Sequence, residues 1–361
     1  MSEEASGPAP HRARAIVFNI LKLAFAGALM WWVLHSVGFG SVKDSLQNIH
    51  TGTWVLGFLA IFIGTCISIV RWYVLMRSVG LDTTLWSAFR LGWIGVFFNN
   101  IVPGLTGGDV VKAIYVTREH PDQRADAVIS VIVDRVIGIV ALALIAAVVI
   151  PFDFDRFGQA AVGIYGFLGV TAVGTVVLLS RRLKARLKAL LGRRAQPVEG
   201  AEPGLLGKID RAVSIYRDRM GTLVVAMLMS FAVHLLLIVG IWLFGGALAH
   251  GNVPAAGLDP VAAAARQQQL DNLGSLGIDV YCSTIPIIMI ISSLPISPAG
   301  IGVGEKAFQH FFGMVGVEGS DAVALSLTYR FTAIITSLLG GVFLVMDRKK
   351  HPKHSPSRHS G

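Results

Sequence analysis

Long apolar runs, separated by short polar segments, set the pattern of this sequence. A helix that crosses a bilayer needs about 20 consecutive, mainly apolar residues. Six runs meet this requirement, and we predict spans at roughly 15–37, 53–76, 125–150, 158–180, 221–249 and 321–346. The pattern therefore predicts an all-α integral membrane protein.

Two further apolar stretches, 85–118 and 280–312, have a different pattern. Each is interrupted near its middle by proline and glycine: Pro103, Gly104, Gly107 and Gly108 in the first, and Pro295, Pro298, Gly300, Gly302 and Gly304 in the second. Proline and glycine break helices, so each stretch should form two short helices joined by irregular chain. Such backbone is tolerated at membrane depth only inside the protein or beside a wet cavity.

The distribution of charge decides whether these stretches cross the membrane. Cytoplasmic loops are enriched in Lys and Arg; segment 181–219 holds eleven of them, whereas 250–279 holds only Arg266 against three aspartates. If 85–101 were a full span, the basic 181–219 segment would lie outside. We therefore predict six transmembrane helices plus two re-entrant helical hairpins, which enter the membrane from opposite faces.

This count fixes the predicted organisation of the chain. The transmembrane domain occupies 15–346, with 181–219 as a basic cytoplasmic loop and 250–279 as an external loop. The tails, 1–14 and 347–361, carry basic residues, and both should lie in the cytoplasm. The expected location is the plasma (inner) membrane, with several passes.

The composition agrees with a membrane protein. Hydrophobic residues make up 53% of the chain and charged residues 15%, against about 45–50% and 25% in soluble domains. The formal charge of +9 gathers in loops and tails, which favours anionic lipid head groups over nucleic acid as partners. We predict no enzyme activity, no catalytic residues, no metal and no cofactor. The phosphate-binding pattern G-x-x-x-x-G-K-[ST] does not occur in the sequence.

The two interrupted stretches carry the candidate chemistry. In each, the turn leads to a carboxylate and a nearby lysine, namely Asp109 and Lys112 in one stretch and Glu305 and Lys306 in the other. An arginine follows in the next span: Arg135 comes 26 residues after Asp109, and Arg330 comes 25 residues after Glu305. This parallel, with opposite entry faces, predicts an inverted repeat like those of many transporters.

These residue types suit the binding of a lipid phosphate. A helix that starts after a glycine turn offers free N–H groups and a positive dipole end, and arginine binds phosphate through two parallel hydrogen bonds. Asp109 and Glu305 would cap helices, pair with the arginines or carry protons. The predicted substrate-binding residues are Asn99, Asn100, Pro103, Gly107, Gly108, Asp109, Lys112, Asp134, Arg135, Pro298, Gly300, Gly302, Gly304, Glu305, Lys306 and Arg330.

Simpler structural roles compete with these assignments. Asp134 and Arg135 could form a local ion pair that only holds their span in place, and the glycines could serve close helix packing alone. Arg71 lies near the end of a span, so we expect its side chain to extend to the membrane surface. His234 stands alone among apolar residues, which favours a hydrogen-bonded core histidine over a proton relay.

Several of these motifs, taken in order, resemble a known family. Asn99, Pro103, Gly104 and Gly107-Gly108-Asp109, then Asp134-Arg135, then Pro295 to Glu305, are similar to the lysylphosphatidylglycerol synthase transmembrane-domain family, also called the flippase-like domain family. The resemblance covers roughly 15–346. It implies a bundle with re-entrant helices around a lipid-accessible cavity. Only a short basic tail follows Lys350, so we do not expect the aminoacyl-transferase activity of the synthase members.

The resemblance and the residues together favour lipid translocation. Members of the family include the flippase half of enzymes that make aminoacylated phosphatidylglycerol, and membrane domains attached to glycosyltransferases. The expected substrate is an anionic phospholipid or a polyprenyl-phosphate-linked lipid, which would move between leaflets. Two alternatives stay open: a membrane-embedded lipid-modifying enzyme, and a structural partner subunit of a glycosyltransferase.

Overall fold

The fold is known from a computed structural model. It describes residues 49–101, 107–179, 216, 217, 219–250, 260–293 and 302–350, together with Trp31 and His35. Every regular element within these ranges is a helix, and none is a strand. The predicted all-α class is therefore confirmed. The predicted span 15–37, the tail 1–14 and most of the loop 181–219 fall outside the described residues.

Four long apolar helices agree with predicted spans. They are α3 (Thr51–Ser78), α6 (Arg124–Val149), α10 (Met220–Ala249) and α14 (Gly319–Lys350). Each is long and apolar enough to cross a membrane, so the protein is a multi-pass membrane protein. A fifth helix, α7 (Phe154–Leu179), occupies the predicted span 158–180. The total of six spans stays a prediction.

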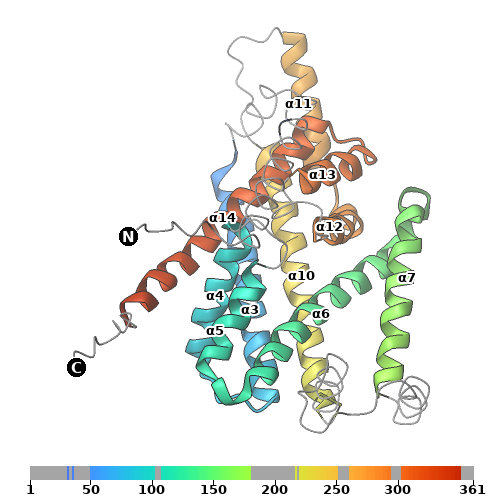
Figure 1. The fold of residues 1–361 in the computed structure, drawn as a ribbon. Coiled ribbons are helices and arrows are strands. Elements are labelled where there is room, and N and C mark those ends of the chain that lie inside the picture. Colours follow the sequence, from blue (N-terminus) through green and yellow to red (C-terminus); the bar gives the residue numbers. More distant parts are fainter. Residues whose placement is uncertain are drawn as a thin grey trace, which may run out of the picture.

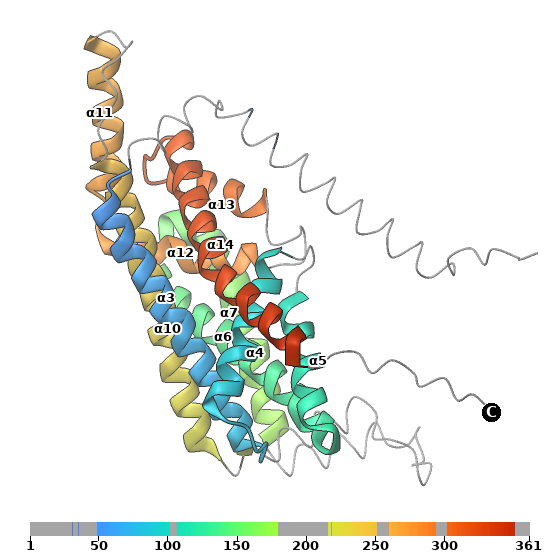
Figure 2. The same ribbon diagram turned by 90° about the vertical axis from the view of Figure 1, so that its left-hand side faces the viewer.

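Helices α3 and α10 lie side by side along most of their length (Figures 1 and 2). Two glycines permit this close approach. A Cβ atom added to Gly57 would lie 2.9 Å from the Gly240 carbonyl oxygen, and one added to Gly240 would lie 3.1 Å from the Gly57 carbonyl oxygen. Small residues at such crossings let helices pack tightly in a membrane, where apolar side chains gain little by leaving lipid.

The first interrupted stretch forms two helices, α4 (Leu85–Ile101) and α5 (Gly107–Glu119). They pack against each other, and their outer ends lie together at the lower edge in Figure 1. Glu119 joins these ends, because it accepts hydrogen bonds from Arg90 and, at 2.5 Å, from the Ser87 hydroxyl. A short 3-10 helix, η1 (Pro121–Gln123), leads on to α6. The two predicted short helices are present, and the predicted break between them lies outside the described residues.

The second interrupted stretch forms α12 (Ile278–Ser292) and α13 (Val303–Gly313) in the upper half of Figure 1. Before it comes α11 (Pro260–Gly274), which meets α12 at an angle of 81°. The helix α11 lies in the segment predicted as an external loop. Residues 262–265 are four alanines in a row, which have the highest helix propensity, and this signal was overlooked.

Helix α7 stands apart from the bundle over much of its length (Figure 1). A 3-10 turn, η2 (Ile150–Asp153), joins it to α6. Its contacts with the bundle gather near its beginning, where Phe157, Ala161 and Ile164 pack with Ile150 and Ile287. The candidate site is therefore built by the other helices.

Candidate functional site

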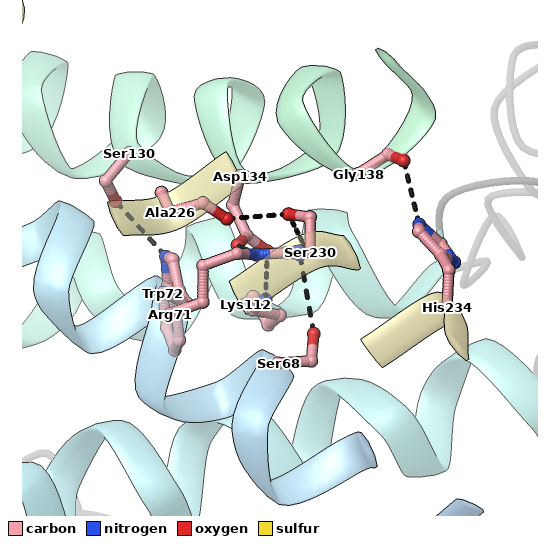
Figure 3. Close-up of polar contacts among 10 residues, drawn as sticks. All are labelled: Ser68, Arg71, Trp72, Lys112, Ser130, Asp134, Gly138, Ala226, Ser230 and His234. Carbon is pink, nitrogen blue, oxygen red and sulfur yellow. Dashed lines mark hydrogen bonds and ion pairs between the residues drawn. The ribbon is translucent and has the colours of Figure 1, made fainter. Parts of the chain in front are cut away.

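A buried ion cluster joins three helices at the centre of the bundle (Figure 3). The Asp134 carboxylate on α6 accepts a 2.8 Å hydrogen bond from Arg71 Nε on α3. Its second oxygen lies 3.5 Å from Lys112 Nζ on α5. The side chains of Arg71 and Asp134 are only 6% and 9% exposed. One carboxylate thus pairs with two cations from different helices.

Neutral polar groups complete the cluster. Arg71 Nη1 donates to the Ser230 hydroxyl on α10 at 2.6 Å, and Nη2 lies 3.4 Å from the Ser68 hydroxyl. The Lys112 ammonium sits 4.2 Å from the centre of the Trp72 ring, a cation–π contact that stabilises a charge away from water. Trp72 in turn donates to Ser130 at 3.3 Å. The cluster is therefore held in one geometry.

Two interpretations from sequence are wrong at this point. Arg71 is buried and does not extend to the membrane surface, because Asp134 and Ser230 offer partners inside the bundle. Asp134 does not form a local pair with Arg135. Successive residues on a helix point about 100° apart, so the two side chains face different neighbours. His234, by contrast, is hydrogen-bonded as predicted, with Nε2 at 2.9 Å from the Gly138 carbonyl oxygen.

Arg135 forms the loosest ion pair of the site. Its Nε lies 3.8 Å from Asp109 Oδ2, which is within ion-pair range but too long for a hydrogen bond. That oxygen is buried and makes no hydrogen bond within the described part of the chain. The Arg135 side chain is 42% exposed. Its guanidinium can therefore accept another anionic partner without breaking a tight contact.

These charged groups line a cavity of about 250 Å³, called here the first cavity. It lies between α3, α4, α5, α6 and α10. Its polar lining consists of Thr65, Ser68, Arg71, Asn99, Asp109, Lys112, Asp134, Arg135, His234 and Ser293. A chamber lined in this way can hold a charged head group inside a membrane protein.

The second interrupted stretch builds a tighter ion pair. Glu305 is fully buried, and its carboxylate accepts hydrogen bonds of 2.6 Å from Arg330 Nε on α14 and from the Gly302 amide. A second cavity of about 220 Å³ lies beside it, lined by Arg330, Gly304, Ser292 and, from the first stretch, Asn100. The parallel between the two carboxylate–arginine pairs therefore extends to their contacts.

A third cavity of about 280 Å³ adjoins both of the others. It shares His234 and Val96 with the first cavity, and Asn100 and Tyr329 with the second. Arg135 and Arg330 each lie eleven residues after the start of their helices, or about 16 Å along the axis. Both arginines therefore lie well inside their helices and away from the helix ends.

The helix starts are less open than predicted. Asn99 Oδ1 accepts a 2.9 Å hydrogen bond from the Gly108 amide at the start of α5, and Glu305 caps α13 through Gly302. Gly302 has φ = 80°, a conformation that favours glycine. Side chains of the protein already occupy part of the N–H sites that we expected a phosphate to use.

Close packing of α4 against α5 explains why position 108 is a glycine. A Cβ atom at this position would lie 2.1 Å from the Gly95 carbonyl oxygen, so α4 and α5 require glycine there. Gly107 begins α5, and Gly304 lines the second cavity. Three predicted site residues, Pro103, Pro298 and Gly300, lie outside the described residues.

Lys306 does not match Lys112 in position. It contacts Gln309 at 2.7 Å and lines none of the three cavities. Lys112 follows Asp109 by three residues and shares its helix face, whereas Lys306 follows Glu305 by one and points elsewhere. The sequence analysis also missed Ser68, Trp72 and Ser230, which are ordinary core residue types and carry no signal in sequence.

The described ranges contain no set of residues that could bind a metal ion. No group of three or more His, Cys, Asp or Glu side chains gathers there. The polar groups of the cavities are cations, carboxylates already paired with them, hydroxyls, amides and the His234 imidazole. This arrangement can bind and release an anion.

Comparison with known proteins identifies the family. The family model described as the lysylphosphatidylglycerol synthase TM region matches residues 19–265, more than half of the chain. The chain belongs to this family. The matched region includes Asp109, Lys112, Asp134 and Arg135, whereas Glu305 and Arg330 lie beyond it.

Relatives of this family member extend the similarity along the chain. A UPF0104 membrane protein of Pyrococcus horikoshii is 23% identical over 348 residues, covering 89% of this chain and 93% of that protein. One from Methanocaldococcus jannaschii is 20% identical and covers 94% of this chain and 97% of that protein. A third, from Methanothermobacter thermautotrophicus, is 22% identical and covers 91% and 92%. These relatives are named as membrane proteins, without a stated activity.

Proposed function

We propose that this protein moves an anionic lipid between the leaflets of the membrane. One observation carries the proposal: adjoining cavities inside a helical membrane bundle are lined by Arg135 and Arg330, which pair with carboxylates of the two interrupted stretches. Ionisable residues inside a membrane are costly and usually mark the path of a charged substrate. The acyl chains would stay in the bilayer while the head group passes through the cavities.

The residues have distinct roles in this proposal. Arg135 holds the lipid phosphate in the first cavity, because its pair with Asp109 is loose. Arg330 receives the phosphate in the second cavity, where Glu305 must release it. Asp109 and Glu305 thus keep the arginines compensated when no lipid is bound. Irregular backbone next to such a path is the pattern found in many transporters.

Charge at the two ends of the bundle supports an orientation. The helix ends at the lower edge in Figure 1, where α3 and α5 end and α4 and α6 begin, carry four arginines, Arg77, Arg90, Arg118 and Arg124, beside Asp82, Glu119, Asp122 and Asp126. The upper end carries mostly carboxylates, at Asp155, Asp271, Asp279, Glu318 and Asp321, with Arg156 and Arg266. Because basic residues mark the cytoplasmic side, the lower end would face the cytoplasm, in the plasma (inner) membrane.

The two interrupted stretches would then be re-entrant hairpins. The α4–α5 pair has its outer ends at the lower edge, and α12 and α13 occupy the upper half of the bundle (Figure 1). Lipid head groups are the partner that the cavities suit. Without a P-loop sequence, ion-coupled or facilitated movement is the expected mode.

Transport by a charge-conserving variant tests the proposal. The protein would be reconstituted into vesicles that contain a fluorescent phosphatidylglycerol, and its movement followed by chemical quenching from outside. Arg135→Lys keeps the charge but loses the planar fork of donors, so we expect slower movement with unchanged helix content. Arg77→Lys is the matched control, because the Arg77–Asp82 pair is exposed. Equal rates for both variants and the unmodified protein would remove Arg135 from the mechanism.

A further inference from the structure

The charges of the first cavity do not balance. Arg71, Lys112 and Arg135 contribute three positive charges to its lining, and Asp109 and Asp134 contribute two negative ones. The segments 102–106 and 294–301, which follow α4 and Ser293 in the chain, contain no charged residue in the sequence. The described lining therefore has a surplus of one positive charge, with His234 counted as neutral.

The surplus is localised on one side chain. Asp134 is shared by Arg71 and Lys112 through contacts of 2.8 and 3.5 Å, and Trp72 adds a cation–π contact to Lys112. Arg135 has only the 3.8 Å contact with Asp109 and the largest exposed fraction of the three cations. An anion that enters the cavity would thus bind at Arg135.

We infer that this cavity selects a lipid head group with a net charge of −1, that is, a phosphodiester that carries no cationic group. The inference rests on the proposed function and narrows its substrate class. A phosphodiester neutralises the surplus of one. A phosphomonoester, whose second pKa is near 6, or a pyrophosphate would bring more negative charge than the lining compensates. An unbalanced charge inside a membrane-spanning bundle is costly whichever its sign.

This class narrows the lipids expected from sequence. Anionic phospholipids with one phosphodiester satisfy the charge balance, and so does a polyprenyl phosphate esterified to a neutral sugar, whereas a free polyprenyl monophosphate or a pyrophosphate-linked lipid does not. The rule also predicts how selectivity changes with the lining. Asp109→Asn raises the surplus to two and should favour a dianion. Arg135→Gln removes the surplus and should abolish the preference for anions.

Binding of short-chain lipids to the purified full-length protein at pH 8 tests the rule. The probes are dioctanoyl phosphatidylglycerol with one charge, dioctanoyl phosphatidic acid as the monoester, dioctanoyl phosphatidylcholine as the zwitterion, and soluble glycerophosphoglycerol. We expect the unmodified protein to bind phosphatidylglycerol about tenfold or more tightly than the other two lipids. Asp109→Asn should reverse the order of phosphatidylglycerol and phosphatidic acid.

A matched control isolates the effect of the site. Asp82 is a fully exposed carboxylate that pairs with Arg77 outside the cavity. Asp82→Asn changes the net charge of the protein by the same amount as Asp109→Asn, and it should leave the lipid order unchanged. Asparagine is close in shape to aspartate, and Asp109 accepts no tight ion pair, so the site variant should fold. A circular dichroism spectrum checks this.

The outcomes separate this inference from the proposed function. If phosphatidic acid binds the unmodified protein as tightly as phosphatidylglycerol, or Asp109→Asn leaves the order unchanged, the charge rule is wrong even where transport occurs. If the order follows the rule but no lipid moves in vesicles, the rule holds and the translocase proposal fails. If glycerophosphoglycerol binds as tightly as the lipid, the ligand is a soluble phosphodiester, which overturns the assignment to a lipid.

Discussion

The buried pair of Arg71 and Asp134 allows a quantitative prediction. Arg71→Met removes a cation whose side chain is 6% exposed and leaves Asp134 with Lys112 alone, at 3.5 Å. Breaking a buried pair on one side costs about 3–5 kcal/mol. Because Lys112 still compensates the carboxylate, we expect the free energy of unfolding to fall by about 3 kcal/mol, the lower end of that range.

The double variant distinguishes the interaction between Arg71 and Asp134 from the effect of losing each side chain alone. Arg71→Met with Asp134→Leu removes both charges, and similar replacements in other proteins are often neutral or stabilising. In the double variant Lys112 loses its contact with Asp134. Asp109 lies about one helical turn before Lys112 on the same face of α5 and can compensate its charge. We expect the double variant to lose only about 1 kcal/mol, which gives a coupling energy of about 2 kcal/mol or more between the two sites.

The assay is a reversible titration of the detergent-solubilised protein with sodium dodecyl sulfate, followed by circular dichroism. The control is Arg77→Met with Asp82→Leu, because this pair is exposed and exposed pairs contribute about 0–1 kcal/mol. If the effects of the two buried single variants add within about 0.5 kcal/mol, Arg71 and Asp134 do not interact. The account of the buried cluster would then be refuted.

Three further predictions concern the hairpins and the topology. Gly108→Ala should lower the free energy of unfolding by about 1–3 kcal/mol in the same titration, because its Cβ would meet the Gly95 carbonyl oxygen at 2.1 Å. Gly163→Ala, whose Cβ would have no atom within 4 Å, should leave the free energy of unfolding unchanged. Equal losses for the two variants would contradict the close packing of α4 and α5. Glu305→Gln should slow the movement of fluorescent phosphatidylglycerol in vesicles, because Arg330 loses its buried carboxylate; an unchanged rate would make this pair structural only. An impermeant thiol reagent added outside should label cysteines placed in 250–279 and not those in 181–219, and the reverse labelling would overturn the orientation.

Most of the fold follows from the hydrophobic pattern. A long apolar run predicts a membrane span almost by itself, because a helix is the structure in which such a run can pair its backbone hydrogen-bonding groups within lipid. The breaks in 85–118 and 280–312 were predictable from proline and glycine. Helix α11 was not predicted. It lies in a segment that the charge distribution indicated as a loop, and the polar residues around its four alanines interrupt the apolar pattern of a span.

The candidate site was only partly predictable. The pairs of Asp109 with Arg135 and of Glu305 with Arg330 follow from the parallel between the two stretches. Arg71 could not be placed, because its role depends on the rotation of α3 against α6, which the sequence does not specify. Lys112 faces the first cavity and Lys306 does not, because Lys112 follows its carboxylate by three residues and Lys306 follows its own by one.

The central claim is that this protein moves anionic lipid between leaflets. Its most direct test is the rate at which the unmodified purified protein moves fluorescent phosphatidylglycerol and fluorescent phosphatidylcholine in reconstituted vesicles. The account predicts rapid movement of phosphatidylglycerol and little movement of phosphatidylcholine. A rate for phosphatidylglycerol no higher than that of protein-free vesicles, measured with correctly folded protein, would contradict it.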